Sequence, residues 1–276
     1  EGYNVVSLSG GEPLLYSELA LLLDHVRQQG MHVMLTTNGT LLTEKRLDPL
    51  QGRVDLMAVS IDGIPESHNQ IRASETAFSA MESNLERLRQ SQIPFGFIFT
   101  LTQFNLDELE WVANFAQAQG AAMLQIHPLE RAGRAASEMI EEWPDEIEKA
   151  YAALEVERLQ ELKGCALPIH LDLVDARMLG QLAEEAFAED CEIWREGSFA
   201  DLVAPLVIEP DGQVSPLQDG FPAQFSLGNV LQEELAEMMR RWREEKAAAF
   251  RRVCRETTQK LSRQQALPFV NWYEAI

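Results

Sequence analysis

The chain before Gly133 alternates between short apolar runs and amphipathic helical stretches, and this alternation limits the possible folds more than any other feature. Apolar runs typical of buried strands cover residues 4–9, 32–37, 54–61, 95–101 and 122–127. Residues with helical spacing separate them, as over 76–90 and 106–119. The pattern predicts right-handed βαβ units around a parallel sheet. Periodicity alone does not choose between an open doubly wound sheet and part of a (β/α) barrel.

A different pattern begins after Gly133. Long helices are predicted over residues 144–163 and about 175–188. Residues 206–217 read as a β-hairpin whose turn is Pro210-Asp211-Gly212, and a basic helix is expected from about 231 to 255. We therefore expect a main α/β region over residues 1–140, a helical connection over 141–195 and a small α+β extension over 196–276.

The charge of the chain restricts its partners. The formal net charge is −21, which repels phosphate backbones and argues against nucleic acid as a partner. Residues 240–276 are an exception, with 9 Lys and Arg against 4 Asp and Glu. No apolar run has the length that spans a bilayer, and the first residues lack a secretory signal, so we expect no membrane partner and a cytoplasmic protein.

Several reaction classes lack their sequence motifs. Cys165, Cys191 and Cys254 are too far apart for metal-site spacing such as C-x-x-C, and we expect them to be buried thiols that hold no metal. The chain has no G-x-S-x-G, H-E-x-x-H, G-K-[ST] or G-x-G-x-x-G motif, which disfavours simple hydrolase, kinase and nicotinamide-dependent functions.

The residues after each predicted strand are the candidates for ligand binding, because α/β sheets bind ligands at the carboxyl ends of their strands. The first strand ends in Gly10-Gly11-Glu12-Pro13. Two glycines let a ligand approach the backbone closely, and the carboxylate that follows suits a cationic or amine-bearing ligand. The same four residues also fit a tight strand-to-helix turn with a solvated glutamate.

The next two predicted strands end in similar polar tips. They are Thr36-Thr37-Asn38-Gly39 and Ser60-Ile61-Asp62-Gly63, followed by His68 and Arg72. Asn-Gly and Asp-Gly are common turn formers, yet three polar tips on successive parallel strands predict the rim of one site. Arg72 is a candidate for binding a carboxylate, although a surface role fits its spacing equally well.

This ordered set of tips, with His68 and Arg72, resembles the radical S-adenosylmethionine superfamily. The resemblance covers residues 4 to about 135, including the segment from His127 to Ala135, and implies a partial (β/α) barrel with parallel strands. The hairpin at 206–217 and Leu227-Gly228-Asn229 resemble the start of the SPASM or twitch extension of one branch. Relatives have one more βα unit before the first matched strand, so the barrel here is expected to lack its first βα unit.

The resemblance also implies roles for the candidate residues. Gly10, Gly11 and Glu12 would line the amino group of S-adenosylmethionine, and Pro13 would belong to the same cofactor site. Thr37 and Asn38 would lie near its methionine moiety, and Ser60 and Asp62 near the ribose or the carboxylate. Arg72 would pair with that carboxylate, and the backbone from His127 to Leu129 would meet the adenine.

The chain departs from the family pattern in two places. A C-x3-C-x2-C loop that ligates a [4Fe-4S] cluster in relatives is missing, and we expect it in a preceding segment of a longer protein. Pro216-Leu217-Gln218 stands where relatives carry a cysteine after the hairpin, which disfavours an auxiliary cluster there.

The resemblance implies a function for the full-length parent, which this chain alone would not perform. The parent would cleave S-adenosylmethionine reductively to a 5'-deoxyadenosyl radical and modify a peptide, protein or cofactor precursor, with an electron donor as partner. The first alternative is a non-catalytic module that binds S-adenosylmethionine or a partner. The second is an unrelated (β/α) barrel whose glycine turns bind a phosphate, which a Glu12 pointing away from the strand ends would favour.

Overall fold

The chain forms two compact units. The computed structural model describes residues 1–276 apart from 131–138, 163–164, 188–190, 219 and 264–267. Asn4–Leu129 and Glu141–Asp172 make up the barrel unit, and Glu1–Tyr3, Glu130–Ile140 and Leu173–Ile276 make up the extension unit. Residues 141–172, which link the α/β region to the extension in sequence, thus belong with the barrel.

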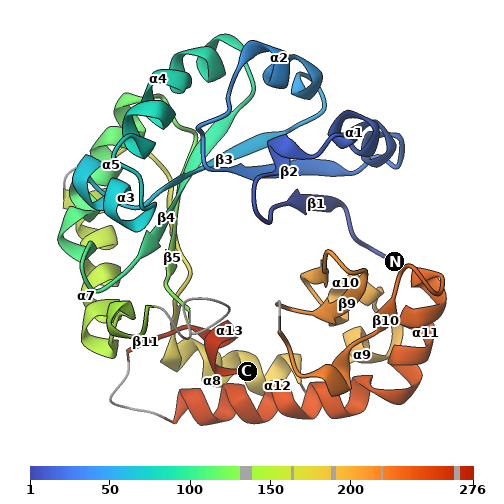
Figure 1. Cartoon of the computed structure of the whole chain (residues 1–276). Coiled ribbons are helices and arrows are strands. Elements are labelled where there is room, and N and C mark those ends of the chain that lie inside the picture. Colours follow the sequence, from blue (N-terminus) through green and yellow to red (C-terminus); the bar gives the residue numbers. More distant parts are fainter. Residues whose placement is uncertain (131–138, 163–164, 188–190, 219, 264–267) are drawn as a thin grey trace. The chain divides into compact units, whose positions relative to one another are not determined.

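The barrel unit contains a six-stranded parallel sheet in which sequence neighbours pair in order. Its strands are β1 (Val5–Leu8), β2 (His32–Thr37), β3 (Leu56–Ile61), β4 (Phe95–Leu101), β5 (Leu124–Pro128) and β6 (Ile169–Leu171). The sheet curls into a half-barrel with the unit's helices along its outer side (Figure 1). This confirms the predicted parallel α/β half-barrel.

The helices of the barrel unit follow the strands as the alternation predicted. They are α1 (Leu19–Gln28), α2 (Glu44–Leu47), α3 (Pro65–Ile71), α4 (Ala77–Gln90), α5 (Leu109–Ala118) and α7 (Glu146–Glu157), with short turns η1 (Pro13–Leu15), η2 (Asp48–Leu50), η3 (Leu106–Glu108) and η5 (Arg158–Leu162). Alternate residues of β4 pack beneath them, and Phe97 and Phe99 are fully buried. Phe97 meets Phe115 of α5, with ring centroids 5.6 Å apart. This apolar layer fixes which side chains face the opposite side of the sheet.

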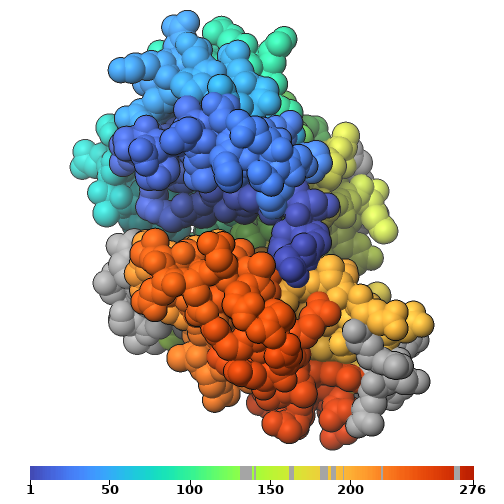
Figure 2. Space-filling model, turned by 90° about the vertical axis from the view of Figure 1, so that its right-hand side faces the viewer, coloured from blue at the N-terminus to red at the C-terminus, as the bar shows by residue number. Residues whose placement is uncertain are grey.

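The extension unit has its own core, in which Trp242 and Phe250 pack at 5.2 Å between ring centroids. Its helices are α8 (Ala176–Ala186), α9 (Glu192–Glu196), α10 (Phe199–Leu202), α11 (Leu235–Glu245), α12 (Ala247–Ser262) and α13 (Trp272–Ala275). Its strands are β7 (Val174–Asp175), β8 (Leu206–Ile208), β9 (Gln213–Pro216), β10 (Gly228–Asn229) and β11 (Phe269–Val270), and η6 spans Ala223–Phe225. Atoms of α11, in orange, lie on the face drawn in Figure 2.

The predicted hairpin is confirmed. Strands β8 and β9 pair antiparallel, with Ile208 opposite Val214, and Gly212 has a φ of 85° in the turn. A positive φ is the reason that glycine suits this position.

Two elements differ from the sequence prediction. Strand β6 was missed because three residues are too few to show a period, and its pairing with β5 assigns it to the sheet. The expected basic helix over 231–255 is two helices, α11 and α12, because the backbone breaks at Lys246, whose φ is −119°. Among the described helices, none combines the length and apolarity needed to cross a membrane.

Candidate functional site

The carboxylate of Glu12 joins the ends of β1 and β2. Its Oε1 accepts from the Thr37 hydroxyl at 2.9 Å, and its Oε2 accepts from the backbone N–H of Asn38 at 2.9 Å. Glu12 also caps η1, because Oε1 accepts from the N–H of Leu14 at 3.2 Å. Glu12 therefore turns toward the strand ends, the orientation opposite to the one that would favour an unrelated phosphate-binding barrel.

The glycines before Glu12 leave the tip of β1 open. Gly10 has a φ of 107°, a conformation that L side chains rarely adopt, so glycine is required there. A Cβ atom built on either Gly10 or Gly11 meets no heavy atom within 4 Å. Pro13 follows as the first residue of η1 and is buried. The tip thus offers exposed backbone beside the Glu12 carboxylate.

Hydrogen bonds within the loop after β2, and others from α4, hold the tip of β2 in place. The side chain of Asn38 accepts from both the N–H and the hydroxyl of Thr40, at 2.9 and 2.6 Å. Asn84 of α4 donates to the carbonyls of Gly39 and Thr40, at 3.0 and 3.1 Å. Sequence reasoning missed Asn84, which lies inside an amphipathic helix and shows no signal of its own.

Beyond β3, Asp62 and Arg72 form an ion pair. Nε of Arg72 lies 2.6 Å from Oδ2 of Asp62, and Nη2 lies 3.1 Å from Oδ1. His68 completes the group, with its Nδ1 3.2 Å from Oδ2. Burial raises the pKa of the Asp62 carboxyl, but the interactions with His68 and Arg72 outweigh it, so the pKa lies below its ordinary value.

Because Asp62 and Arg72 are paired, their predicted roles in binding a ligand differ: Asp62 orients Arg72, and Arg72 is available to the ligand. The Asp62 side chain is only 2% exposed, so it holds Arg72 from beneath, whereas the Arg72 side chain is 35% exposed. A guanidinium has five N–H donors, and Asp62 engages two of them. The others remain for a ligand. Ser60 lies two residues before Asp62, on β3, and is half-buried.

Two further residues missed in the sequence hold the loop after β3. Asn105 donates to the carbonyls of Asp62 and Thr100, both at 2.9 Å. Glu108 accepts from the N–H of Ile64 at 2.8 Å and from the hydroxyl of Ser67 at 2.5 Å. Both come from the segment after β4. They would have been found only by knowing that β3 and β4 are neighbours.

A cavity of about 340 Å³ lies within this group of tips. It is lined by Asn38, Thr40, His68, Arg72, Ser74, Thr76, Ala77 and Ala80. Of the predicted residues, Asn38 and Arg72 therefore share one cavity, and Glu12 and Thr37 are hydrogen-bonded next to it. The cavity combines a cation with amide and hydroxyl groups, which suits a ligand that carries a carboxylate.

The predicted residues on β5 lie elsewhere on the sheet and do not line this cavity. His127 is opposite Thr100 in the β4–β5 pairing, and its Nδ1 forms an ion pair with Oδ2 of Asp172, just beyond β6. The backbone N–H of Leu129 donates to the carbonyl of Leu101 at 2.8 Å. Asp172 was not predicted, because β6 was not predicted.

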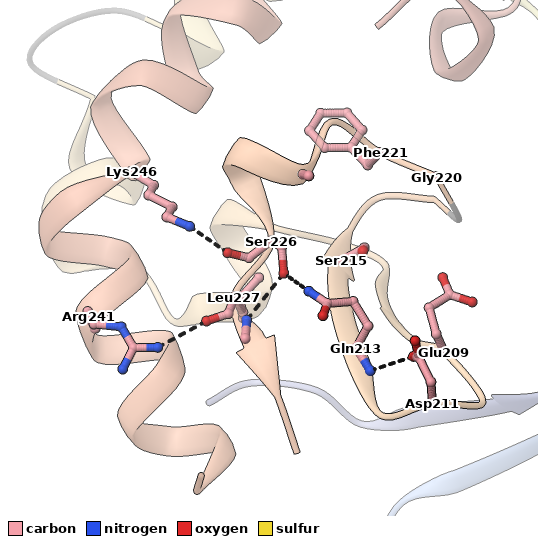
Figure 3. A pocket seen from close by; sticks show the side chains of 12 residues that line it. Glu209, Asp211, Gln213, Ser215, Gly220, Phe221, Ser226, Leu227, Arg241 and Lys246 are labelled. Carbon is pink, nitrogen blue, oxygen red and sulfur yellow. Dashed lines mark hydrogen bonds between the residues drawn. The ribbon is translucent and has the colours of Figure 1, made fainter. Parts of the chain in front are cut away.

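A second cavity, of about 600 Å³, lies within the extension unit (Figure 3). Glu209, Asp211 and Gln213 line one side. The cations on the other side bind backbone carbonyls, since Lys246 donates to Ser226 at 2.7 Å and Arg241 to Leu227 at 3.2 Å. No cysteine is among its described lining residues, so this set offers no thiolate for an auxiliary cluster.

These features define a class: a parallel α/β half-barrel with a polar cavity near the carboxyl ends of its strands. Residues 1–116 match the sequence model of the Radical SAM superfamily, in which SAM is S-adenosylmethionine, also written AdoMet. Over these residues the chain is similar to this superfamily, whose cofactors are S-adenosylmethionine and a [4Fe-4S] cluster.

Two proteins of Methanosarcina barkeri are similar in sequence. An Fe-coproporphyrin III synthase is 25% identical over 248 residues, which cover 86% of this chain and 61% of that protein. An AdoMet-dependent heme synthase is 33% identical over 135 residues, 48% of this chain and 39% of that protein. The chain thus spans less than two thirds of either relative.

A solved structure supports the fold. It is described as native anSMEcpe with bound AdoMet and Cp18Cys peptide, and it superposes with a TM-score of 0.63 at 18% identity. The match covers 99% of this chain and 81% of that one.

The two cofactors of the superfamily fit these residues differently. The exposed backbone at Gly10 and Gly11 and the free donors of Arg72 suit the amino and carboxylate groups of S-adenosylmethionine. A cluster needs several thiolates together. Within the described part of the chain, no group of three or more His, Cys, Asp or Glu side chains could hold a metal, so these residues do not fit the cluster.

Proposed function

We propose that this chain is the S-adenosylmethionine-binding part of a radical enzyme. In its full-length form the enzyme would cleave S-adenosylmethionine reductively to a 5'-deoxyadenosyl radical and modify a precursor molecule. The observation that carries the proposal is the arrangement around Glu12 and Arg72. One cavity is lined by Asn38 of the β2 tip and by Arg72, which is paired with Asp62 of the β3 tip. Hydrogen bonds to Glu12 join the glycine tip of β1 to the β2 tip.

Each residue would have a distinct part in holding the cofactor. Gly10 and Gly11 would present backbone carbonyls to the ammonium group, and Glu12 would keep the tips of β1 and β2 together. Arg72, braced by Asp62, would bind the carboxylate. The carboxylate of Glu12 already accepts three hydrogen bonds, so we assign the ammonium to the backbone first.

The sequence relatives bear on the substrate. Their names place them in the formation of iron coproporphyrin and heme, and one similarity extends over 86% of this chain. Among peptide, protein and cofactor precursors, we therefore favour a cofactor precursor of the tetrapyrrole class. A SPASM- or twitch-like extension beginning at the β8–β9 hairpin remains part of the proposal, as does an external electron donor.

Calorimetric titration with S-adenosylmethionine tests the binding proposal. We expect one site per chain, and a much weaker affinity in the variant Arg72→Ala, which removes the carboxylate partner. Arg27→Ala is the matched control, because Arg27 pairs with Asp55, beside the amino ends of β2 and β3. Absence of binding in the unaltered chain, or equal affinity in the Arg72 variant, would contradict the proposal.

Anaerobic reconstitution with iron and sulfide separates cofactor binding from catalysis. The described residues offer no cluster site, so the 276-residue chain should gain no cluster absorption and form no 5'-deoxyadenosine. Both would be expected of a longer chain with the cluster-binding loop. A longer chain that binds S-adenosylmethionine without forming 5'-deoxyadenosine would support the non-catalytic module instead.

A further inference from the structure

His127 belongs to β5, and the helices of the barrel unit lie along one side of its sheet and leave the other side uncovered (Figure 1). Its neighbours on β5, Leu124 and Ile126, are fully buried in the apolar core. Side chains alternate along a strand, so Gln125 and His127 face the opposite, concave side. The His127 side chain is 44% exposed there. A molecule bound on this side of the sheet would meet this imidazole.

Asp172 fixes the orientation of the imidazole. Its carboxylate contacts Nδ1 of His127, and Nε2 of Gln125 lies 3.3 Å and 3.4 Å from its two oxygens. The backbone N–H of Asp172 donates to the carbonyl of Ile126 at 3.0 Å, which ties the carboxylate to β5. A carboxylate accepts the proton of Nδ1, so the lone pair of the neutral imidazole is on Nε2.

This arrangement has the chemistry of a metal-ligating histidine. Histidines that bind metals through one ring nitrogen donate the other N–H to a carboxylate or carbonyl, which fixes the ring and raises its basicity. Neutral imidazole is also a common axial ligand of porphyrin iron. We propose that Nε2 of His127 ligates the iron of an iron-porphyrin substrate, with Asp172 and Gln125 as positioning residues. The proposal rests on the function proposed above and names the substrate class of that enzyme.

A second histidine–carboxylate pair in the same unit lacks these properties. Nδ1 of His32 lies 3.4 Å from Asp55, but Asp55 also binds Arg27 and the backbone N–H of Val33, both at 2.7 Å. His32 begins β2, so it lies at the amino ends of the strands, whereas His127 lies near the carboxyl end of β5. His32 therefore provides a matched control.

The test is a titration of the 276-residue chain with ferric coproporphyrin III, followed by the Soret band. We expect a Soret shift typical of imidazole ligation in the unaltered chain and in His32→Ala, and its loss in His127→Ala. Added imidazole should restore the shift in porphyrin that stays with His127→Ala after gel filtration, because an unfolded variant would retain no porphyrin. Asp172→Asn should keep the shift and weaken affinity about tenfold, the usual effect of removing a carboxylate behind a ligating histidine.

Two further measurements distinguish a failure of the His127 proposal from a failure of the proposed function. Iron-free coproporphyrin III should bind the unaltered chain and His127→Ala equally, because no iron is there to ligate. His170 on β6 lies opposite Gln125 and is the competing candidate. An equal Soret shift in both proteins, or its loss only in His170→Ala, would overturn the proposal for His127. S-adenosylmethionine binding, measured calorimetrically on the same preparations, stays intact in that case. Loss of that binding in the unaltered chain would instead overturn the proposed function.

Discussion

Individual residues at the strand ends act mainly by joining neighbouring tips. Glu12 links β1 to β2, and Asn105 links the loop after β3 to the end of β4. The position of residues directly after predicted strands singled out Glu12 and Asn38 in the sequence, and Arg72 was singled out as a candidate for binding a carboxylate. Position after a strand could not indicate the bond from Asn105 to Asp62 or the bond from Gln125 to Asp172, because each joins residues more than 40 positions apart along the chain.

Replacing Glu12 by alanine tests its bridging role. The change leaves the hydroxyl of Thr37 and the N–H of Asn38 without their acceptor, which should cost about 1–3 kcal/mol of unfolding free energy. It should also weaken S-adenosylmethionine binding. Urea unfolding measures the first effect, with the exposed Glu82→Ala on α4 as control. Equal stability of the two variants would show that the bridge has no energetic role.

Asp62 should make stability depend on pH. Its pKa is lower in the folded than in the unfolded protein, so its contribution is complete above the unfolded value, about 3.9, and is lost as the pH falls through the folded value. Asp62→Asn removes this contribution. The stability difference between the two proteins, measured by urea unfolding from pH 7 down to pH 2, should be largest at pH 7 and shrink in acid. A difference that is constant with pH would contradict the assignment.

At the scale of elements, the loop between β3 and α3 depends on close backbone approach. Gly63 has a φ of 137°, and a Cβ atom there would lie 1.9 Å from Oε2 of Glu108. The loop conformation and the Glu108 contacts to Ile64 and Ser67 thus require glycine. The sequence indicated a turn at Asp62-Gly63 but not this contact, which depends on the neighbouring strand.

The variant Gly63→Ala should be less stable than Gly120→Ala. Gly120 also has a positive φ, 78°, but a Cβ atom there meets nothing within 4 Å, so its variant measures the backbone penalty alone, about 1–2 kcal/mol. Gly63→Ala adds the clash with Glu108 and should lower S-adenosylmethionine affinity. Thermal unfolding and calorimetry on both variants check this. Identical losses would mean that Glu108 moves aside freely.

At the scale of the whole molecule, the five apolar runs predicted a parallel α/β sheet, and the resemblance of the strand-end motifs implied the half-barrel. Neither predicted that the barrel unit is discontinuous in sequence. Residues 141–172 rejoin it through β6, and the three residues Ile169–Leu171 have too little pattern to reveal that pairing. Packing of α7 and β6 against the sheet, rather than local propensity, decides this assignment.

The net charge of −21 should make the stability of the whole chain depend on salt concentration, an effect that no single contact determines. Like charges repel in the compact state, and salt screens them, with a Debye length of about 10 Å at 0.1 M and about 3 Å at 1 M. Added NaCl should therefore raise the melting temperature, and a gain of about 1 kcal/mol corresponds to about 2–4 °C.

Two exposed positions separate this general repulsion from local ion pairs. Glu157→Lys at the end of α7 reduces the net negative charge and should raise the melting temperature at low salt, whereas Arg252→Glu on α12 increases it and should lower the melting temperature. Both differences in melting temperature should shrink in about 0.5 M NaCl, because salt at this concentration screens the interactions between exposed charges. Differential scanning calorimetry of the unaltered chain and both variants, at low salt and in about 0.5 M NaCl, gives the two melting-temperature differences at each salt concentration. Shifts that persist in high salt would assign the effects to helix propensity or packing at those positions instead of to the charge of the whole molecule.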